Sequence, residues 1–283
     1  HGVIPSRPHA ATAAPLLEEP EAKHEAASSF PTTTLYDGTN PRTSYEWNQM
    51  SIERVGVIGG GLMGSGIVEV NARAGLDVVL VEVSDEAAKS AHDRIVASLE
   101  RAADRGKISP QDLAAALERI SVTDDLERLA DRQLVVEAAS EVEQVKLDLF
   151  RRVGRILIDE DAILTSNTSS IPIVKLGAVS GRADRVMGVH FFNPAPVMKL
   201  VELIPSLTSS PETLERMRGY VTDGLGKEPI EATDRAGFVV NSLLVPSLLS
   251  AIRMYEAGYA SAADIDQGMV LGCGHPMGPL ALS

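Results

Sequence analysis

Two side chains twelve residues apart are of the types that transfer protons in enzymes. His190 follows the apolar run 186–189, so we expect it at the carboxyl end of a strand, and Glu202 lies inside the next apolar run, 200–204. A carboxylate in such a run is costly to bury alone, and an imidazole at a neighbouring strand end would be a suitable partner. Such a pair would suit a general base near neutral pH. The spacing alone also fits a surface histidine and a glutamate on a half-exposed edge strand.

Small polar side chains follow another apolar run, at residues 163–164. Residues 165–170 read Thr-Ser-Asn-Thr-Ser-Ser, and either Ser169 or Ser170 could cap a helix that begins near Pro172. A helix cap does not require the neighbouring hydroxyl and amide groups. The whole segment therefore indicates a polar ligand at the carboxyl edge of a sheet.

Three further polar residues lie inside or beside apolar segments. Asn241 falls within the apolar helical stretch 237–245, where its amide needs a partner. Glu141 follows the run 134–138, and Lys146 comes about one helical turn later. Capping by Glu141 and plain solvation of Lys146 fit the spacing as well as a ligand contact does.

A glycine-rich turn provides the chemistry for binding phosphates. Gly59, Gly61 and Gly64 follow a short apolar run and open an amphipathic segment, in the Gly-x-Gly-x-x-Gly spacing of dinucleotide-binding folds. The start of the helix offers free N–H groups and a partial positive charge to a pyrophosphate. Glu82, 21 residues after Gly61, ends the next apolar run and can accept both ribose hydroxyls. This favours NAD over NADP, because a carboxylate repels a 2′-phosphate.

The elements that must position these groups alternate between short apolar runs and helical stretches from residue 52 onward. This alternation predicts an α/β fold with a mostly parallel, doubly wound sheet of Rossmann type. We expect strands at 55–58, 78–81, 120–122, 134–138, 163–166, 186–189, 201–204 and 229–232. The intervening helices are expected at 63–74, 85–105, 110–118, 125–130, 143–158 and 211–225.

The pattern changes after Asp234. Residues 237–256 are almost continuously helical with an interruption at Pro246, and 262–270 begin another helix. We therefore predict a Rossmann-type domain over 51–234 and the start of an all-helical domain over 235–283. Residues 1–50 lack sustained periodicity and are expected to form a disordered N-terminal extension, since they carry too little apolar surface to offset their ordering entropy.

The bulk composition excludes several classes of partner. The 283 residues include 26 basic and 39 acidic side chains, a net charge of −13, with no basic run, so nucleic acid and acidic membranes are not expected to bind. No apolar run reaches the about 18 to 20 residues that span a bilayer. The single cysteine, Cys273, in a glycine-rich loop at 271–275, favours a reducing, cytoplasmic location.

Taken together, the motifs resemble the L-3-hydroxyacyl-CoA dehydrogenase family, and within it the bacterial members that act on 3-hydroxybutyryl-CoA. The resemblance extends over residues 51–283 with the motifs in consistent order. The segments that carry it are GGGLMGSG (59–66), VVEAASE (135–141), SNTSS (166–170), HFFNP (190–194), PVMKLVE (196–202), GFVVN (237–241) and GHPMGP (274–279).

The resemblance implies an enzyme that uses NAD to oxidise an (S)-3-hydroxyacyl-CoA reversibly to the 3-oxoacyl-CoA, with the substrate in a cleft between the two domains. His190 would take the hydroxyl proton as hydride leaves C3, and Glu202 would orient and stabilise the imidazole. Ser169 and Asn241 would bind the substrate oxygens, with Asn193 beside the histidine.

The same resemblance assigns cofactor and coenzyme A contacts. The adenosine half and pyrophosphate of NAD would lie against Gly59, Gly61, Leu62, Met63, Gly64 and Glu82. Glu141, Lys146 and Asn167 would lie near the nicotinamide half. Ser98 and Arg105 fall where the family contacts the CoA moiety.

Two departures from the family leave alternatives open. Residues 1–50 are not part of its pattern, and the family continues for several helices beyond Ser283, so we expect the helical domain to be incomplete here and a homodimer where it is complete. The alternatives are a catalytically silent NAD-binding relative, an inactive fragment, and a dehydrogenase of a free 3-hydroxy acid. Activity with acetoacetyl-CoA but not with free acetoacetate would exclude the last.

Overall fold

The structure is a computed structural model that describes residues 51–283. The expected N-terminal extension, residues 1–50, lies outside the described residues. Within the described part, no helix is long and apolar enough to cross a membrane.

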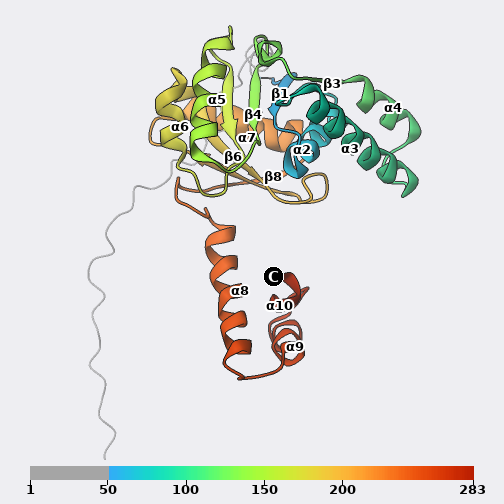
Figure 1. The fold of residues 1–283 in the computed structure, drawn as a ribbon, viewed down its shortest axis with the longest axis vertical. Coiled ribbons are helices and arrows are strands. Elements are labelled where there is room, and N and C mark those ends of the chain that lie inside the picture. Colours follow the sequence, from blue (N-terminus) through green and yellow to red (C-terminus); the bar gives the residue numbers. More distant parts are fainter. Residues whose placement is uncertain (1–50) are drawn as a thin grey trace, which may run out of the picture. The chain divides into compact units, whose positions relative to one another are not determined.

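An eight-stranded sheet forms the centre of the part that precedes the C-terminal helices, in the order β3-β2-β1-β4-β5-β6-β7-β8 (Figure 1). The strands are β1 (Arg54–Ile58), β2 (Asp77–Val81), β3 (Ile120–Thr123), β4 (Leu134–Glu137), β5 (Ile163–Ser166), β6 (Val186–Phe191), β7 (Leu200–Pro205) and β8 (Glu228–Glu231). Neighbouring strands are parallel except for the antiparallel pair β6 and β7. The expected mostly parallel, doubly wound sheet is therefore confirmed.

The strand order reverses between β1 and β4, and the glycine-rich turn follows β1 at this point. In open α/β sheets a crevice for ligands forms at such a switch point, at the carboxyl ends of the strands. The sheet thus brings the chemistry-bearing turns after β1, β4, β5 and β6 to one edge.

Three of the helices begin at a serine that caps their first turn. Ser84, Ser109 and Ser210 each accept a hydrogen bond from a first-turn amide, and Ser109 forms a full capping box with Asp112. The helical segments are α2 (Leu62–Arg73), α3 (Asp85–Asp104), α4 (Pro110–Glu118), η1 (Leu126–Leu129), α5 (Glu143–Ile156), α6 (Ile173–Ser180), η2 (Ala183–Arg185), α7 (Pro211–Gly219) and η3 (Tyr220–Gly224).

Two of the expected helices differ in kind from the prediction. The segment expected at 125–130 is the short 3₁₀ turn η1, and the helix expected to reach 225 changes into the π-helical turn η3 after Gly219. Gly219, Gly224 and Gly226 weaken α-helical propensity in this region, which explains the early end.

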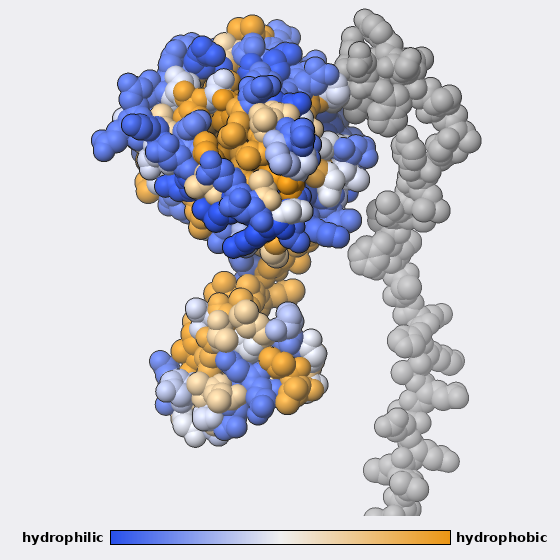
Figure 2. Space-filling view, turned by 90° about the vertical axis from the view of Figure 1, so that its right-hand side faces the viewer, coloured by the Kyte–Doolittle hydropathy of each residue, from blue (hydrophilic) through white to orange (hydrophobic). Residues whose placement is uncertain are grey.

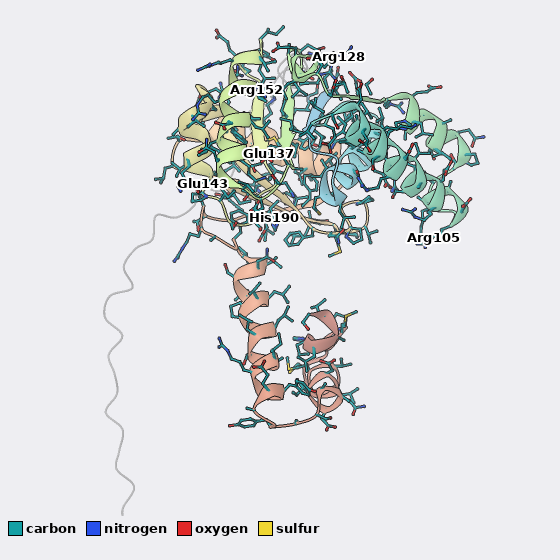
Figure 3. All side chains as sticks on the ribbon, in the orientation of Figure 1. Arg105, Arg128, Glu137, Glu143, Arg152 and His190 are labelled. Carbon is teal, nitrogen blue, oxygen red and sulfur yellow. The ribbon has the colours of Figure 1, made fainter. Side chains whose placement is uncertain are left out.

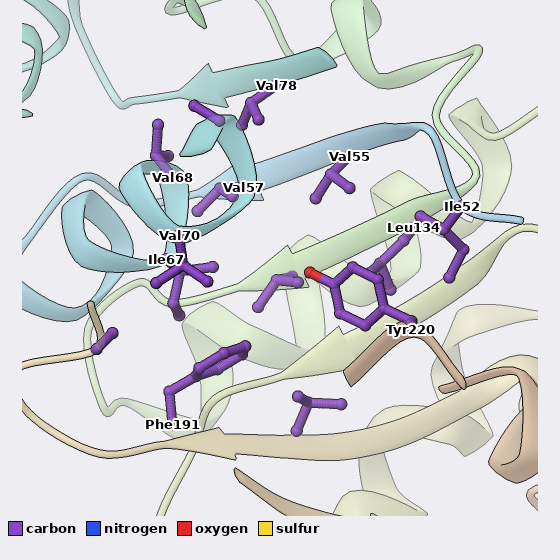
Figure 4. Close-up of a cluster of buried hydrophobic side chains, with 14 of the residues drawn as sticks. Ile52, Val55, Val57, Ile67, Val68, Val70, Val78, Leu134, Phe191 and Tyr220 are labelled. Carbon is purple, nitrogen blue, oxygen red and sulfur yellow. The ribbon is translucent and has the colours of Figure 1, made fainter. Parts of the chain in front are cut away.

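Apolar side chains cover both faces of the sheet. Leu134 and Val136 of β4 belong to the core beneath α2, α3, α4 and α7, whereas Val135 between them joins the core beneath α5 and α6. Figure 4 shows the first of these clusters, with Tyr220 beside Leu134 and Phe191 at the other end of the cluster, on the side of Ile67. Burial on both faces explains why the strands read as continuous apolar runs.

The C-terminal part is helical, as expected. It consists of α8 (Val240–Glu256), α9 (Ala262–Cys273) and α10 (Pro279–Leu282), which contact one another (Figure 1). Each helix has one buried residue, namely Ala251, Ile265 and Pro279. Asp266 of α9 accepts hydrogen bonds from the backbone N–H groups of Leu280 and Ala281, which fixes α10.

Two expectations about the helical part are wrong. Helix α8 continues through Pro246 without interruption, because a proline removes only one hydrogen bond of an otherwise long helix. Cys273 is the last residue of α9 rather than a loop residue, and its side chain is exposed.

Candidate active site

The imidazole of His190 and the carboxylate of Glu202 face each other across an antiparallel pair of strands. The register of β6 and β7 places the two residues directly opposite, and Nδ1 of His190 lies 2.6 Å from Oε2 of Glu202. Glu202 is fully buried and β7 lies between two other strands, so the alternative of an exposed edge pair is wrong. Since the carboxylate can only accept, Nδ1 carries the proton and Nε2 is the nitrogen available to a ligand.

The second oxygen of Glu202 is held by the first turn of α8. Oε1 accepts hydrogen bonds of 3.0 Å from the backbone N–H groups of Val239 and Val240. The start of a helix presents free amides and the positive end of the helix dipole, so it stabilises a negative charge at this point. These two amides are contacts that the sequence did not point to, because a backbone donor carries no residue signature.

Two aromatic rings hold the imidazole in place. Phe192 and Phe238 lie edge to face with His190, with ring centroids 4.7 and 5.4 Å away. Phe238 has a φ of +44°, a left-handed conformation that side-chain-bearing residues seldom adopt. Sequence reasoning missed Phe238, since an apolar residue at the start of an apolar helix gives no functional signal.

A cavity of about 400 Å³ opens beside the imidazole. Its lining residues come from the end of β6, from the segments that follow β1, β4, β5 and β6, and from α8. Eight of its lining residues were expected in the site from the sequence: Met63, Glu141, Lys146, Asn167, Ser169, His190, Asn193 and Asn241. Ala138, Ala139, Phe191 and Phe192 complete the wall.

A buried ion pair lies at the base of this cavity. Nζ of Lys146 donates to both carboxylate oxygens of Glu137, at 2.7 and 2.8 Å, and the two side chains are 1% and 0% exposed. Solvation of Lys146 is thus excluded. Glu137 also accepts from Ser166 Oγ at 2.6 Å and from the N–H of Ala139 at 2.7 Å. The sequence analysis missed Glu137, although the argument applied to Glu202, a carboxylate at an apolar run, would have found it.

Glu141 extends this network toward the surface. Its carboxylate lies 3.4 Å from Nζ of Lys146 and accepts hydrogen bonds from Thr168 Oγ1, the N–H of Ser169 and Ser170 Oγ. Burial acts to raise the pKa of Glu141, but the bond from Thr168, the charge of Lys146 and the serine bonds outweigh it and lower the pKa.

The serines do not cap the following helix, so that reading of the segment is wrong. The N–H groups of Ile173 and Val174, at the start of α6, instead donate to the two carboxylate oxygens of Asp234, at 2.9 Å each. Asn167 uses its side-chain oxygen to accept from the N–H of Phe191 at 2.8 Å, which leaves its NH₂ group for a ligand.

The three motif glycines of the glycine-rich turn each have a geometry that fits a dinucleotide. Gly59 has a φ of +90° and lies against the backbone of Ala139, where a Cβ would approach to 2.8 Å. A Cβ on Gly61 would meet nothing within 4 Å, so this side of the turn is open to a phosphate. Leu62 is exposed next to it, and Gly64 packs so closely on Gly59 that no side chain would fit.

Glu82 lies beside this turn, where a ribose would follow the phosphates. Its Oε1 accepts from the N–H of Gly60 at 2.6 Å, and Oε2 accepts from the N–H of Val83 at 3.0 Å. Arg94 of α3, a residue not expected in the site, donates to the carbonyl of Gly60 and so holds the turn from the other side.

Ser98 and Arg105 lie apart from this group of residues. Ser98 is half-buried on α3, and Arg105 is exposed just after the helix ends. Figure 3 shows Arg105 far from His190 and Glu137, and neither Ser98 nor Arg105 lines the cavity.

Comparison with known proteins matches both parts of the chain to one family. The pattern of the 3-hydroxyacyl-CoA dehydrogenase NAD binding domain matches residues 54–235, and that of the 3-hydroxyacyl-CoA dehydrogenase C-terminal domain matches residues 237–283.

Individual relatives are similar over most of their length. The chain is 50% identical over 233 residues to a 3-hydroxybutyryl-CoA dehydrogenase of Mycobacterium tuberculosis, covering 82% of each chain. It is 42% identical to the mitochondrial hydroxyacyl-coenzyme A dehydrogenase of Sus scrofa, covering 82% of this chain and 75% of that one. The crystal structure of (S)-3-hydroxybutyryl-CoA dehydrogenase from Ralstonia eutropha superimposes with a TM-score of 0.78 at 44% identity, covering 82% of this chain and 81% of that chain.

Proposed function

The chain belongs to the 3-hydroxyacyl-CoA dehydrogenase family, and we propose that His190 is the base with which it oxidises a short-chain (S)-3-hydroxyacyl-CoA. Its activity is the reversible, NAD-dependent conversion of the 3-hydroxy to the 3-oxo thioester. The observation that supports this role for His190 is the buried pair with Glu202 at the wall of the cavity. 3-Hydroxybutyryl-CoA is the substrate that we propose, because the bacterial relatives carry that name.

The proton in this reaction moves to His190. Nε2 accepts the proton of the substrate hydroxyl as the C3–O bond becomes a carbonyl, and the ring becomes imidazolium. NAD held along Glu141, Lys146 and Asn167 would supply the acceptor for the hydride of C3. Glu202 stabilises the imidazolium through Nδ1, and the amides of Val239 and Val240 keep its carboxylate fixed while the charge on the ring changes.

We assign the other polar groups of the cavity to substrate and cofactor. Ser169, Asn193 and Asn241 offer donors near His190 for the substrate oxygens. Glu141, Lys146 and Asn167 would lie along the nicotinamide half of NAD. The glycines at 59, 61 and 64, with Leu62, Met63 and Glu82, would hold its pyrophosphate and adenosine.

The CoA moiety and the assembly are further parts of the proposal. Ser98 and Arg105 of α3 would contact CoA outside the cavity. The exposed apolar side chains of α8 support a homodimer formed through the helical part. The single cysteine supports a reducing, cytoplasmic setting.

The proposal is tested by following NADH absorbance after addition of acetoacetyl-CoA. We expect the parent to consume NADH and His190→Gln to lose about 10²-fold or more in kcat, the lower part of the range for general bases. His92→Gln is the matched control, because His92 is exposed on α3 and does not line the cavity. Turnover of free acetoacetate at a comparable rate, or full activity of His190→Gln, would contradict the proposal.

A further inference from the structure

The buried ion pair beneath the cavity has an excess of negative charge. Glu137 and Lys146 would neutralise each other if they stood alone, since both are buried and Nζ binds both carboxylate oxygens. Glu141 adds a second carboxylate 3.4 Å from the same Nζ. Two carboxylates and one ammonium give this group, the Glu137–Lys146–Glu141 network, a net charge of −1.

The network needs no ligand to complete its hydrogen bonds. Glu137 accepts from Lys146, Ser166 and the N–H of Ala139, and Glu141 accepts from Thr168, Ser169 and Ser170. What the network offers to a molecule in the cavity is therefore mainly its charge. In a partly desolvated site a unit charge acts more strongly than in water.

The location of the network decides which part of the cofactor experiences this charge. The glycine-rich turn follows β1 and His190 lies near the end of β6, and β4 and β5 lie between these two strands in the sheet. Glu141 and Lys146 follow β4 and line the cavity together with His190. In the proposed function, the nicotinamide half of NAD would extend from the pyrophosphate at that turn toward the substrate carbon beside His190. It would therefore pass over Glu141 and Lys146.

The two redox forms of the cofactor differ in charge at this position. The nicotinamide ring carries a unit positive charge in NAD⁺ and none in NADH, whereas the rest of the molecule is the same. Glu202, the other carboxylate near the cavity, lies behind the imidazole with both oxygens bound inside the protein. The Glu137–Lys146–Glu141 network is thus the negative group that the cavity wall presents, through the carboxylate of Glu141.

We propose that the Glu137–Lys146–Glu141 network sets the preference between the two redox forms, by favouring the binding of NAD⁺ over NADH. The proposal rests on the proposed function, which places the nicotinamide in this cavity. Glu137 acts through Lys146 and is a positioning and charge-setting residue, because it does not line the cavity.

The test is the ratio of the dissociation constants of NAD⁺ and NADH, measured by calorimetry or by nicotinamide fluorescence. Glu137→Gln and Glu141→Gln each remove one negative charge, so we expect both to raise Kd(NAD⁺)/Kd(NADH) by about fivefold. Lys146→Met removes the positive charge and is expected to lower the same ratio by about the same factor. Opposite signs distinguish charge from damage, since a purely structural defect weakens both forms alike.

Glu143→Gln is the matched control, because Glu143 pairs with Lys175 on the exposed surface and is expected to leave the ratio unchanged. Glu141 is 42% exposed, so its variant keeps the test valid if Glu137→Gln fails to fold. A ratio that stays at the parent value in Glu141→Gln and Lys146→Met would overturn the proposal. Failure of the proposed function looks different, since the parent itself would then neither bind NADH nor reduce acetoacetyl-CoA.

Discussion

The ability of His190 to act as a base beside Glu202 depends on which nitrogen of the imidazole carries the proton. Oε2 of Glu202 accepts from Nδ1, and Oε1 is already bound to the amides of Val239 and Val240. This arrangement orients the carboxylate and the ring together. A substitution that keeps the shape of the Glu202 side chain but removes its charge therefore tests whether this carboxylate sets the tautomer of His190.

Glu202→Gln is expected to lower kcat by about 10²-fold or more. The amide oxygen must face Val239 and Val240, so the NH₂ group faces Nδ1 and makes that nitrogen an acceptor. The ring proton then moves to Nε2, which can no longer take the hydroxyl proton. The measurement is kcat with 3-hydroxybutyryl-CoA, alongside the dissociation constant of NADH, which shows that the variant is folded.

Glu228→Gln provides the control, because Glu228 is exposed at the start of β8 and carries the same change. We expect its kcat to equal that of the parent. If Glu202→Gln binds NADH normally and keeps its kcat, the role assigned to the carboxylate is wrong.

The elements of the fold owe their positions partly to caps that come from distant residues. Asp234 follows β8 and binds the first two free amides of α6, 61 and 60 residues earlier in the chain. The same carboxylate precedes the turn that leads into α8, so it holds the start of α6 beside the segment that contacts Glu202.

Asp234→Ala is expected to lower the free energy of unfolding by about 1 kcal/mol, the usual cost of losing an N-cap. Urea denaturation followed by circular dichroism measures this difference. Asp223→Ala, at an exposed aspartate in η3, is the control and should have little effect. A loss as large in Asp223→Ala as in Asp234→Ala would show that the cap contributes nothing specific.

This cap also marks the limit of what the sequence reveals about the elements. The strands and the glycine-rich turn were predicted well because apolar runs and glycine spacing are local signals. His190 and Glu202 could be proposed as partners, but only the antiparallel register of β6 and β7 shows that they meet. The cap by Asp234, the pairing of Glu137 with Lys146, and the ring of Phe238 on His190 arise from tertiary contacts, which leave no local pattern.

At the scale of the whole described chain, the first turn of α8 links the helical part to the candidate active site. The N–H of Gly237 donates to the carbonyl of Ser169, and the next residues bind Glu202 and pack on His190. Asn241 then reaches the cavity from the same helix. The orientation of α8 therefore affects the base, the substrate contacts and the cavity wall together, so whatever stabilises the far end of α8 also matters for the site.

The remaining length of α8 carries apolar side chains that face solvent, which Figure 2 shows as apolar residues on the surface of the helical part. Leu243 is 72% and Leu249 is 44% exposed. Large apolar side chains that are exposed in this number often mark a contact with another protein chain. In the proposed homodimer, these side chains of α8 would be covered by the second copy.

The double variant Leu243→Lys, Leu249→Lys is accordingly expected to sediment as a monomer under conditions in which the parent sediments as a dimer. Two buried lysines would place unpaired positive charges in an apolar contact, which is strongly unfavourable. Leu207→Lys is the matched control, because Leu207 is 95% exposed in the NAD-binding part and should leave the dimer intact. A parent that sediments as a monomer, or a double variant that remains a dimer, would show that α8 does not form the contact. Because the start of α8 also binds the carboxylate of Glu202, we expect the monomeric double variant to lose kcat as well. Such a loss would connect assembly to the position of the base.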